Sequence, residues 1–312
     1  MYIGVDLGGT NIAVGLVDDN GNIVATDSTP TIKERHYSEI VADMAALAKK
    51  VTENAGYSIS DVKGVGIGCP GTVNNDMGTV VYSNNIVMHN VPLAKEFRKH
   101  IDLPVNLEND ANAAAYGEYI RYGENVPGFV FITLGTGVGG GMILDGKIWR
   151  GFNGAGAELG HTTLYHGGKP CTCGKFGCWE AYASVTALIE QTKEAIAAHP
   201  ESMMREWAEK KGKVNGRTSF ECAELGDKTA IAVRDQYLEY VAEGISSIVN
   251  ILQPNILAIG GGISREGDTL LDPIKEYVYK YDYNKHMPKT DIRIAHLFGD
   301  AGIVGAAMSA KQ

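Results

Sequence analysis

The sequence predicts an α/β protein of two related domains, and three observations indicate this fold class. Short apolar segments typical of buried strands recur along the chain, and segments with helical spacing lie between them. A strand, a loop of glycine and threonine, a second strand and a hairpin turn occur at residues 2–26 and again at residues 129–150. The chain has 312 residues, which is enough for two hydrophobic cores. We therefore expect two similar domains, each offering one Gly/Thr loop to a shared cleft.

We place the boundary between these domains within the chain's first half. A small α/β domain is expected over residues 1–118, completed by a closing helix over residues 299–312. A larger α/β domain is expected over residues 119–298, and it contains a cysteine-rich loop.

Composition excludes several classes of protein. Hydrophobic residues make up 44% of the chain and charged residues 21%, as in ordinary globular enzymes. With 28 basic and 37 acidic residues the net charge is -9, which argues against a nucleic-acid partner. No run of eighteen apolar residues occurs, and residues 2–5 already form an expected strand, so neither a membrane helix nor a signal peptide is expected. Five cysteines, three of them in one loop, favour the reducing cytoplasm.

The first Gly/Thr loop lies inside a predicted hairpin. Tyr2 to Leu7 is an expected strand that leads into Gly8-Gly9-Thr10-Asn11, and Asn20-Gly21 after the next strand is a strong hairpin signal. A dinucleotide-binding fingerprint would open a helix instead, so that alternative is rejected. The other expected elements here are helices over 36–54, 92–100, 109–122 and 301–310, and strands over 12–17, 23–26, 64–68 and 105–108.

The second Gly/Thr loop follows an expected strand at Phe129 to Leu134. It comprises Gly135-Thr136-Gly137-Val138-Gly139-Gly140-Gly141, before a short strand and an Asp145-Gly146 turn. No Gly-Lys is followed by Ser or Thr, which excludes a Walker A loop. Residues 199–219 are expected to be solvated surface without chemistry. The other expected elements are helices over 180–198, 201–211, 219–225, 228–252 and 271–281, and strands over 142–144, 256–259 and 292–296.

The cysteine-rich loop is a candidate structural zinc site. His161, Cys171, Cys173 and Cys178 supply three thiolates and one imidazole, a complete tetrahedral set with no open position. The alternative is three ordinary buried thiols. A Cys-x-Cys-x4-Cys cluster among glycines favours the metal, which would hold the loop rigid and orient Glu158, His161 and Glu180 on its borders.

The two Gly/Thr loops and two acidic residues indicate phosphoryl transfer. Backbone N–H groups and the hydroxyls of Thr10 and Thr136 can hold phosphates without a lysine. Asp6, at the end of the first strand, could hold Mg²⁺ or its waters. Asp110 is the candidate general base for a sugar hydroxyl. The alternative for Asp110 is a helix N-cap, a common role for an acidic residue at a helix start.

Seven motifs together resemble the ROK family, which joins bacterial sugar kinases to related repressors within the actin-like ATPase superfamily. The resemblance runs from Met1 nearly to Gln312, and the zinc motif is its most specific part. It implies a two-domain actin-like ATPase fold, of the duplicated ribonuclease H-like kind, with a structural zinc loop. The motifs are DLGGTN (6–11), CPGT (69–72), ENDANAAAYGE (108–118), LGTGVGGG (134–141), GAELGH (156–161), CTCGKFGCWE (171–180) and GGGI (260–263).

The resemblance also implies an activity and residue roles. The pattern is most similar to the family's glucokinases, so the expected reaction transfers the γ-phosphate of ATP to the 6-hydroxyl of a hexose, with Mg²⁺ on the phosphates. Asp110 is then the base, and a homodimer is expected. The implied sugar ligands are Asn109, Glu158, His161 and Glu180, with Gly71 at the sugar's edge and Asn84 as a weaker candidate. The implied nucleotide-binding residues are Asp6, Gly8, Gly9, Thr10, Asn11, Gly135, Thr136 and Gly137, with Gly260, Gly261 and Gly262 near the adenosine.

Several alternatives stay open at this stage. The substrate could be fructose, mannose, allose or an N-acetylhexosamine, and the donor could be polyphosphate. A sugar sensor without catalysis is the rival class; a repressor would need a helix-turn-helix module before the first strand, and an actin-like chaperone would have no use for the zinc loop.

Overall fold

The structure is a computed structural model that describes residues 1–83 and 85–311. By packing, the chain divides into two compact units. The first unit comprises Met1–Phe131, Gly140–Ala157 and His296–Gln312, and the second comprises Ile132–Gly139 and Glu158–Ala295. The predicted domain boundary between residues 118 and 119 stays a prediction.

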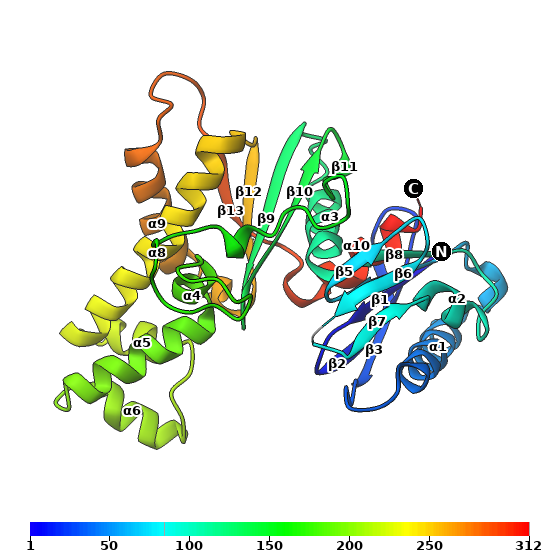
Figure 1. Ribbon diagram of the computed structural model, residues 1–312, viewed down its shortest axis with the longest axis horizontal. Helices are drawn as coiled ribbons and strands as arrows, with labels where there is room; N and C mark the ends of the chain where they lie inside the picture. Colours follow the sequence, from blue (N-terminus) through cyan, green and yellow to red (C-terminus); the bar gives the residue numbers. More distant parts are fainter. Residues whose placement is uncertain (84, 312) are drawn as a thin grey trace. The chain divides into compact units, whose positions relative to one another are not determined.

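The first unit is built on a five-stranded sheet of order β3-β2-β1-β4-β8 (Figure 1). Strands β1, β2 and β3 form an antiparallel meander, whereas β4 and β8 run parallel to β1. The carboxyl ends of the parallel strands therefore lie at one edge, which carries Asp6, Cys69 and Asn109. The strands are β1 (Tyr2–Leu7), β2 (Asn11–Val17), β3 (Ile23–Pro30), β4 (Val65–Cys69) and β8 (Val105–Asn109).

Helices α1 and α10 cover opposite faces of this sheet. Ile3 shares a buried core with Ile40 and Met44 of α1. Gly4, the next residue, faces the other way, because a Cβ there would lie 2.0 Å from the carbonyl oxygen of Ile303 in α10. The helices of this unit are α1 (Tyr37–Asn54), α2 (Leu93–Arg98), α3 (Asp110–Tyr122) and α10 (Ala301–Ser309), with short 3₁₀ turns η1 (Ile59–Asp61) and η4 (Phe298–Asp300).

Glycines explain why α10 lies so close to its neighbours. A Cβ on Gly66 of β4 would be 1.7 Å from the carbonyl oxygen of Ala306, and one on Gly305 would be 1.6 Å from that of Ala113 in α3. Any larger residue at these positions would separate backbones that are in direct contact. The small residues of the predicted closing helix therefore serve close packing.

A small antiparallel sheet of order β5-β6-β7 was not predicted from the sequence. Its strands are short, and the middle one exposes two adjacent residues, Val81 and Tyr82, so no alternation marks it. The strands are β5 (Thr72–Asn74), β6 (Thr79–Ser83) and β7 (Met88–Val91).

A second five-stranded sheet has the order β11-β10-β9-β12-β13. The β9–β10 hairpin repeats the arrangement of β1 and β2, as the internal repeat predicted. Strand β11 pairs antiparallel to β10, and β13 pairs parallel to β12. The strands are β9 (Gly128–Leu134), β10 (Val138–Leu144), β11 (Lys147–Ile148), β12 (Ile256–Gly260) and β13 (Asp291–Ile294).

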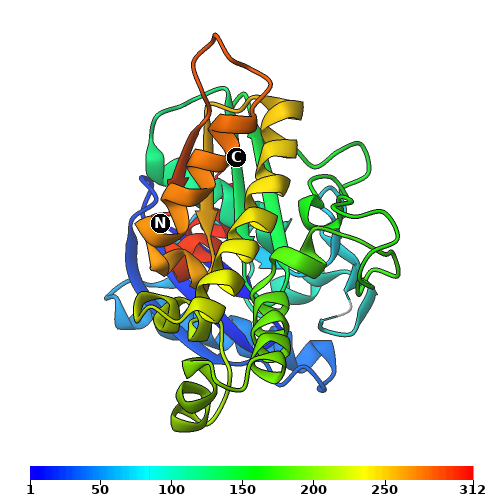
Figure 2. The same cartoon turned by 90° about the vertical axis from the view of Figure 1, so that its left-hand side faces the viewer.

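Of this sheet, β12, β13 and the ends of β9 and β10 beside the second Gly/Thr loop belong to the second unit, which is otherwise mostly helical. Its longest helix, α8, packs beside α9, and Figure 2 shows the two in yellow and orange. Across the described residues, no helix is both long and apolar enough to cross a membrane. The helices are α4 (Glu180–Ala183), α5 (Val185–Ala198), α6 (Met203–Lys211), α7 (Thr218–Glu224), α8 (Lys228–Leu252) and α9 (Asp268–Tyr281), with 3₁₀ turns η2 (Leu159–His161) and η3 (Gly262–Glu266).

Three expectations from the sequence need correction. The helix predicted over 180–198 is broken at Ser184, which is extended and caps α5 by accepting the N–H of Ala187. The loop predicted over 135–141 ends at Gly137, because Val138 to Gly141 belong to β10. Gly141 lies so close to α3 that a Cβ would be 2.5 Å from that of Ala115.

The third correction concerns residues 199–219. Met204 is fully buried and packs with Cys222 and Ala230, so part of this stretch belongs to a core rather than to solvated surface. The helix predicted over 201–211 is present as α6, Met203–Lys211.

Candidate functional site

The first Gly/Thr loop, residues 8–11, is held by a threonine distant in sequence. Thr31 is fully buried; its backbone N–H donates to the carbonyl of Thr10 at 2.9 Å and its hydroxyl to that of Gly8 at 2.6 Å. Within the loop, the N–H of Gly8 donates to the carbonyl of Asn11 at 3.0 Å. With their carbonyls held in place, the loop residues have a defined backbone, which a phosphate-binding loop needs.

The second Gly/Thr loop, residues 135–137, is held in the same way. The N–H of Gly135 donates to the carbonyl of Gly137 at 3.0 Å. The hydroxyl of Thr186 donates to the carbonyl of Thr136 at 2.8 Å, and the N–H of Val185 donates to that of Gly135 at 2.9 Å. Sequence reasoning missed both Thr31 and Thr186, since no local pattern marks a hydroxyl that bonds to a distant carbonyl.

Asp110 is the first residue of α3, but it is not the N-cap. That role belongs to Asn109, whose side-chain oxygen accepts the N–H of Asn112 at 3.1 Å. Burial raises the pKa of Asp110, which makes its carboxylate a stronger base.

The charge of Asp110 also acts on Asp6. Burial raises the pKa of Asp6 to about 6, and the nearby charge of Asp110 adds to this increase. Gly302 of α10 lies against the carboxylate, because a Cβ there would be 2.5 Å from Oδ2 of Asp6. A carboxylate whose proton affinity is raised both by burial and by a neighbouring negative charge favours a bound cation.

Asn109 also connects to Gly71, two residues after β4. Its side-chain amide donates to the carbonyl of Gly71 at 3.1 Å. Gly71 has a φ of 98°, and a Cβ there would lie 2.1 Å from the carbonyl oxygen of Tyr82, so only glycine fits. The structure thus brings together Gly71, Asn109 and Asp110. Asn84, the weaker sugar-binding candidate, lies outside the described residues.

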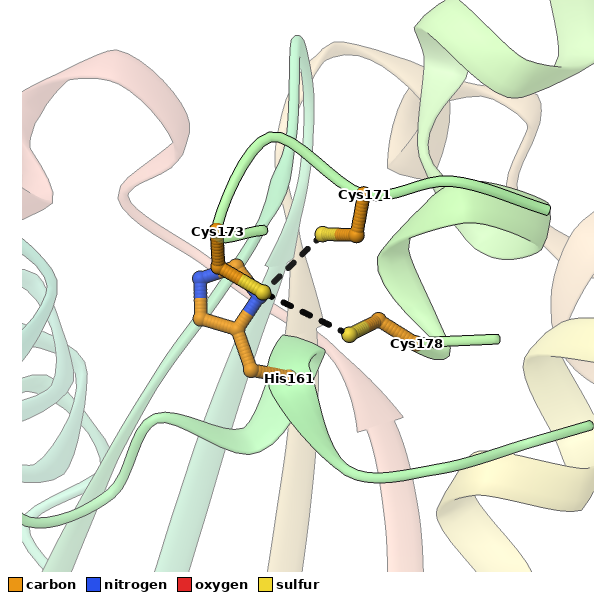
Figure 3. A group of neighbouring side chains, drawn as sticks. All are labelled: His161, Cys171, Cys173 and Cys178. Carbon is orange, nitrogen blue, oxygen red and sulfur yellow. Dashed lines mark hydrogen bonds between the residues drawn. The ribbon is translucent and has the colours of Figure 1, made fainter. Parts of the chain in front are cut away.

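The four predicted metal ligands come together in one cluster, shown in Figure 3. One ligand atom from each of His161, Cys171, Cys173 and Cys178 lies within 4.8 Å of the others. The sulfurs of Cys173 and Cys178 are 3.6 Å apart, and Nδ1 of His161 is 3.6 Å from the sulfur of Cys171.

These distances fit zinc. With Zn–S bonds of about 2.3 Å and Zn–N bonds of about 2.0 Å, tetrahedral geometry places two sulfurs about 3.8 Å apart and a sulfur and nitrogen about 3.5 Å apart. The loop that carries the cysteines is closed by its own backbone pairs, Thr163 with Cys178 and Pro170 with Phe176. Residues 161–178, the metal loop hereafter, can therefore hold zinc through Nδ1 of His161 and three sulfurs.

Two carboxylates border the metal loop. Glu180, the first residue of α4, accepts the N–H of Val138 at 2.9 Å through Oε2 and the thiol of Cys171 at 3.7 Å through Oε1. Glu158 is exposed and immediately precedes η2, which ends at His161. Glu158, His161 and Glu180 are thus placed by the metal loop and its neighbouring turns.

Of the three glycines after β12, Gly261 has a clear structural requirement. Its φ is 89°, and a Cβ there would lie 2.2 Å from the carbonyl oxygen of Leu134. A Cβ on Gly262 would meet nothing within 4 Å. Gly260 ends β12, so the three residues turn the chain sharply into η3.

Comparison with known proteins identifies the family. Residues 2–312 match the model of the ROK family. The chain belongs to this family. It is 37% identical over 313 residues to a glucokinase of Halalkalibacterium halodurans, covering 100% of this chain and 95% of that protein. It is 37% identical over 314 residues to a glucokinase of Thermotoga maritima, covering 99% of this chain and 97% of that protein.

A solved structure agrees with this assignment. A ROK family glucokinase from Streptomyces griseus, in complex with glucose and AMPPNP, has a TM-score of 0.85 and 36% identity to this ROK protein. The match covers 100% of this chain and 99% of that one. The predicted fold class, a two-domain actin-like ATPase of the α/β class, is confirmed.

Proposed function

We propose that this ROK protein is an ATP-dependent hexokinase that phosphorylates the 6-hydroxyl of glucose, with Asp110 as the general base. The observation that carries the mechanism is the carboxylate of Asp110 at the start of α3. Burial raises its pKa, and Asn109 rather than Asp110 provides the N-cap of the helix. The choice of substrate and donor rests on the similarity to glucokinases, one of them solved with glucose and an ATP analogue.

In the proposed reaction, Asp110 accepts the proton of the sugar hydroxyl. The hydroxyl oxygen then forms a bond to the γ-phosphorus, and the bond from that phosphorus to the β,γ-bridging oxygen breaks, so that ADP leaves. The two Gly/Thr loops would donate backbone N–H groups and the hydroxyls of Thr10 and Thr136 to the phosphates, with Asn11 beside them. Gly260 to Gly262 would lie near the adenosine.

Mg²⁺ is part of the proposal, and Asp6 is the residue that would hold it or its waters. The fit rests on the raised pKa of Asp6, about 6, which results from burial and the charge of Asp110 and which a neighbouring cation would offset. Bound Mg²⁺ would neutralise charge on the phosphates.

Asn109, Glu158, His161 and Glu180 would bind the sugar hydroxyls, with Gly71 at the sugar's edge. The metal loop with zinc would supply rigidity rather than chemistry, because its four ligands leave no open position. His161 would bind zinc through Nδ1 and the sugar through its other nitrogen, so that the metal determines the tautomer.

Two further parts of the proposal concern the protein's cellular location and its oligomeric state. None of the five cysteines, all of which the structure describes, forms a disulfide, which supports a reducing cytoplasm as the location. Family resemblance supports a homodimer, and light scattering on the purified protein tests it.

The proposal is tested by an ADP-release assay with Mg-ATP over glucose, fructose, mannose, allose and N-acetylhexosamines, with polyphosphate as a second donor. We expect turnover to be fastest with glucose and ATP, and to be lost in Asp110→Ala while glucose binding survives. Turnover with another hexose alone would keep the mechanism and replace the substrate. Sugar binding without turnover would identify a sensor.

A further inference from the structure

Glu108 is a buried carboxylate to which sequence reasoning assigned no role. Its side chain is 1% exposed, and it lies in β8, two residues before Asp110. Oε2 accepts from both Nη2 and Nε of Arg150, at 2.6 and 2.8 Å, and from the amide of Asn75 at 3.2 Å. Oε1 accepts the backbone N–H of Asn109 at 3.0 Å and the amide of Asn112 at 3.4 Å.

This network is a costly way to stabilise a fold. Glu108 is buried whereas Arg150 is 30% exposed, so the pair must overcome the desolvation of Glu108 and part of that of Arg150. Well-packed apolar residues of similar volume often give equal or greater stability. Buried pairs of this kind can instead impose a particular local geometry.

On one side, the network orients the residues around Asp110. The N–H that Glu108 accepts belongs to Asn109, whose side chain caps α3 and donates to the carbonyl of Gly71. The Glu108 carboxylate thus fixes the turn from β8 into α3 through its bond to Asn109. Asp110 is the residue that follows Asn109 in this turn.

On the other side, the network holds the stretch that leads to Glu158. Arg150 begins this stretch, and its carbonyl accepts the N–H of Gly156 at 2.9 Å, which closes residues 150–156 into a compact loop. Gly154 of the same loop lies against β5, because a Cβ there would be 2.7 Å from the carbonyl oxygen of Val73.

We propose that Arg150, through Glu108, is a positioning residue for phosphoryl transfer: it orients the Asp110 carboxylate and anchors the segment that continues into Glu158. The inference rests on the proposed function, in which Asp110 is the base and Glu158 binds the sugar. Arg150 itself touches neither the sugar nor the phosphates in this proposal.

The test compares kinetics and stability in three variants of the full-length protein. Arg150→Met leaves the Glu108 charge without its partner, whereas the double variant Glu108→Gln/Arg150→Met removes the charge as well. Arg98→Met is the matched control, because Arg98 is 57% exposed and pairs with Asp102 only at 3.6 Å.

We expect Arg150→Met to lower kcat by between about tenfold and a hundredfold, as a misplaced catalytic group does, and to raise the KM for glucose. We expect the KM for ATP to stay within about twofold of the wild-type value, because neither Gly/Thr loop is hydrogen-bonded to Glu108 or Arg150. Arg98→Met should match wild type in every measurement.

The pH profile separates positioning from stability. Asp6 on β1 and Cys69 on β4 interact electrostatically with Asp110, and Glu108 on β8 lies two residues before it. The charges of Asp110 and Glu108 both raise the pKa of Cys69, so the two carboxylates act on the same region. With Arg150 removed, the Glu108 charge should raise the pKa of Asp110 and move the acid limb of kcat to higher pH.

In the double variant we expect the acid limb and the melting temperature to return toward wild type while kcat stays low. A double variant with recovered stability and wild-type kcat would overturn the inference and leave a purely structural ion pair. Failure of the proposed function looks different, because the wild-type protein itself would then phosphorylate no hexose.

Discussion

The carboxylate of Glu180 accepts the backbone N–H of Val138 at 2.9 Å, and this bond joins the start of α4, just after the metal loop, to the start of β10, just after the second Gly/Thr loop. A Cβ on Gly137, just before Val138, would lie 2.3 Å from Oε2 of Glu180, so a larger residue there would displace this carboxylate. A residue assigned to sugar binding thus also supports a loop assigned to phosphate binding.

This bond predicts that Glu180→Ala impairs the use of both substrates. The sugar loses a ligand and the N–H of Val138 loses its acceptor, so the KM values for glucose and ATP should both rise. A hydrogen bond to a charged group contributes about 1.5–3 kcal/mol, or roughly tenfold to a hundredfold.

Glu158→Ala is the matched control, and steady-state kinetics with each substrate varied in turn is the measurement. Removing Glu158 should raise only the KM for glucose. If Glu180→Ala leaves the KM for ATP unchanged, the bond to Val138 has no role in the phosphate loop.

The second prediction concerns the metal. Purified protein should contain zinc equal in amount to the chain, and Cys173→Ala should lose the metal and melt at a lower temperature, because three ligands hold zinc less tightly than four. Metal analysis and thermal unfolding make the measurement.

Cys222→Ala is the control, since Cys222 is a buried core residue outside the cluster. It should melt earlier through lost packing but keep its zinc. Protein that melts at the same temperature before and after chelation would contradict a structural metal.

A third prediction tests the threonines that hold the Gly/Thr loops. Thr31→Val keeps the volume of the side chain but removes the hydroxyl that donates to Gly8, so the loop carbonyl loses its partner. We expect the KM for ATP to rise about threefold to tenfold, in line with a lost hydrogen bond of about 1 kcal/mol, while the KM for glucose is retained.

Thr192→Val provides the comparison. Thr192 is also fully buried and donates to the carbonyl of Leu188 within α5, away from either loop. Both variants should lose similar stability by thermal unfolding, but only Thr31→Val should change the kinetics. Equal KM values for ATP in the two variants would mean that the hydrogen bond of Thr31 contributes only to stability.

The fourth prediction follows from the pKa of Asp6, which burial and Asp110 raise from 3.8 to about 6. A carboxyl whose pKa is raised by folding loses stabilisation as pH rises from its unfolded value through its folded value. Asp6→Asn should therefore be more stable than wild type above pH 6, by up to about 3 kcal/mol.

The difference between Asp6→Asn and wild type should shrink as pH falls from 6 toward 4, where Asp6 is protonated when folded. Thermal unfolding without nucleotide or Mg²⁺ across this range is the measurement. A pH-independent difference would show that Asp6 titrates normally. Under the proposed function the same variant should also lose activity, because Asp6 is the residue proposed to hold Mg²⁺ or its waters.

Much of the fold and site was predictable because the signals are local. Asn20-Gly21 and Asp145-Gly146 mark their hairpins within a few residues, and the metal ligands of the cysteine loop lie close together in sequence. The geometry of that cluster follows once the loop closes on itself.

The features missed by sequence reasoning depend on distant contacts. The bond from Thr31 to Gly8 and the pair of Glu108 with Arg150 join residues far apart in the chain, and neither has a periodic pattern. Gly141 was assigned to a loop because its reason for being glycine, the approach of α3, is visible only in the folded structure.

The most direct test of the central claim follows the product itself. Purified protein is incubated with Mg-ATP and glucose, and phosphorus NMR identifies the phosphorylated sugar, with Asp110→Asn studied beside the wild type. We predict glucose 6-phosphate from the wild type and, since general-base catalysis contributes about a hundredfold or more, almost none from the variant. Equal rates of product formation in the two proteins, or no phosphorylated sugar from either, would contradict the account.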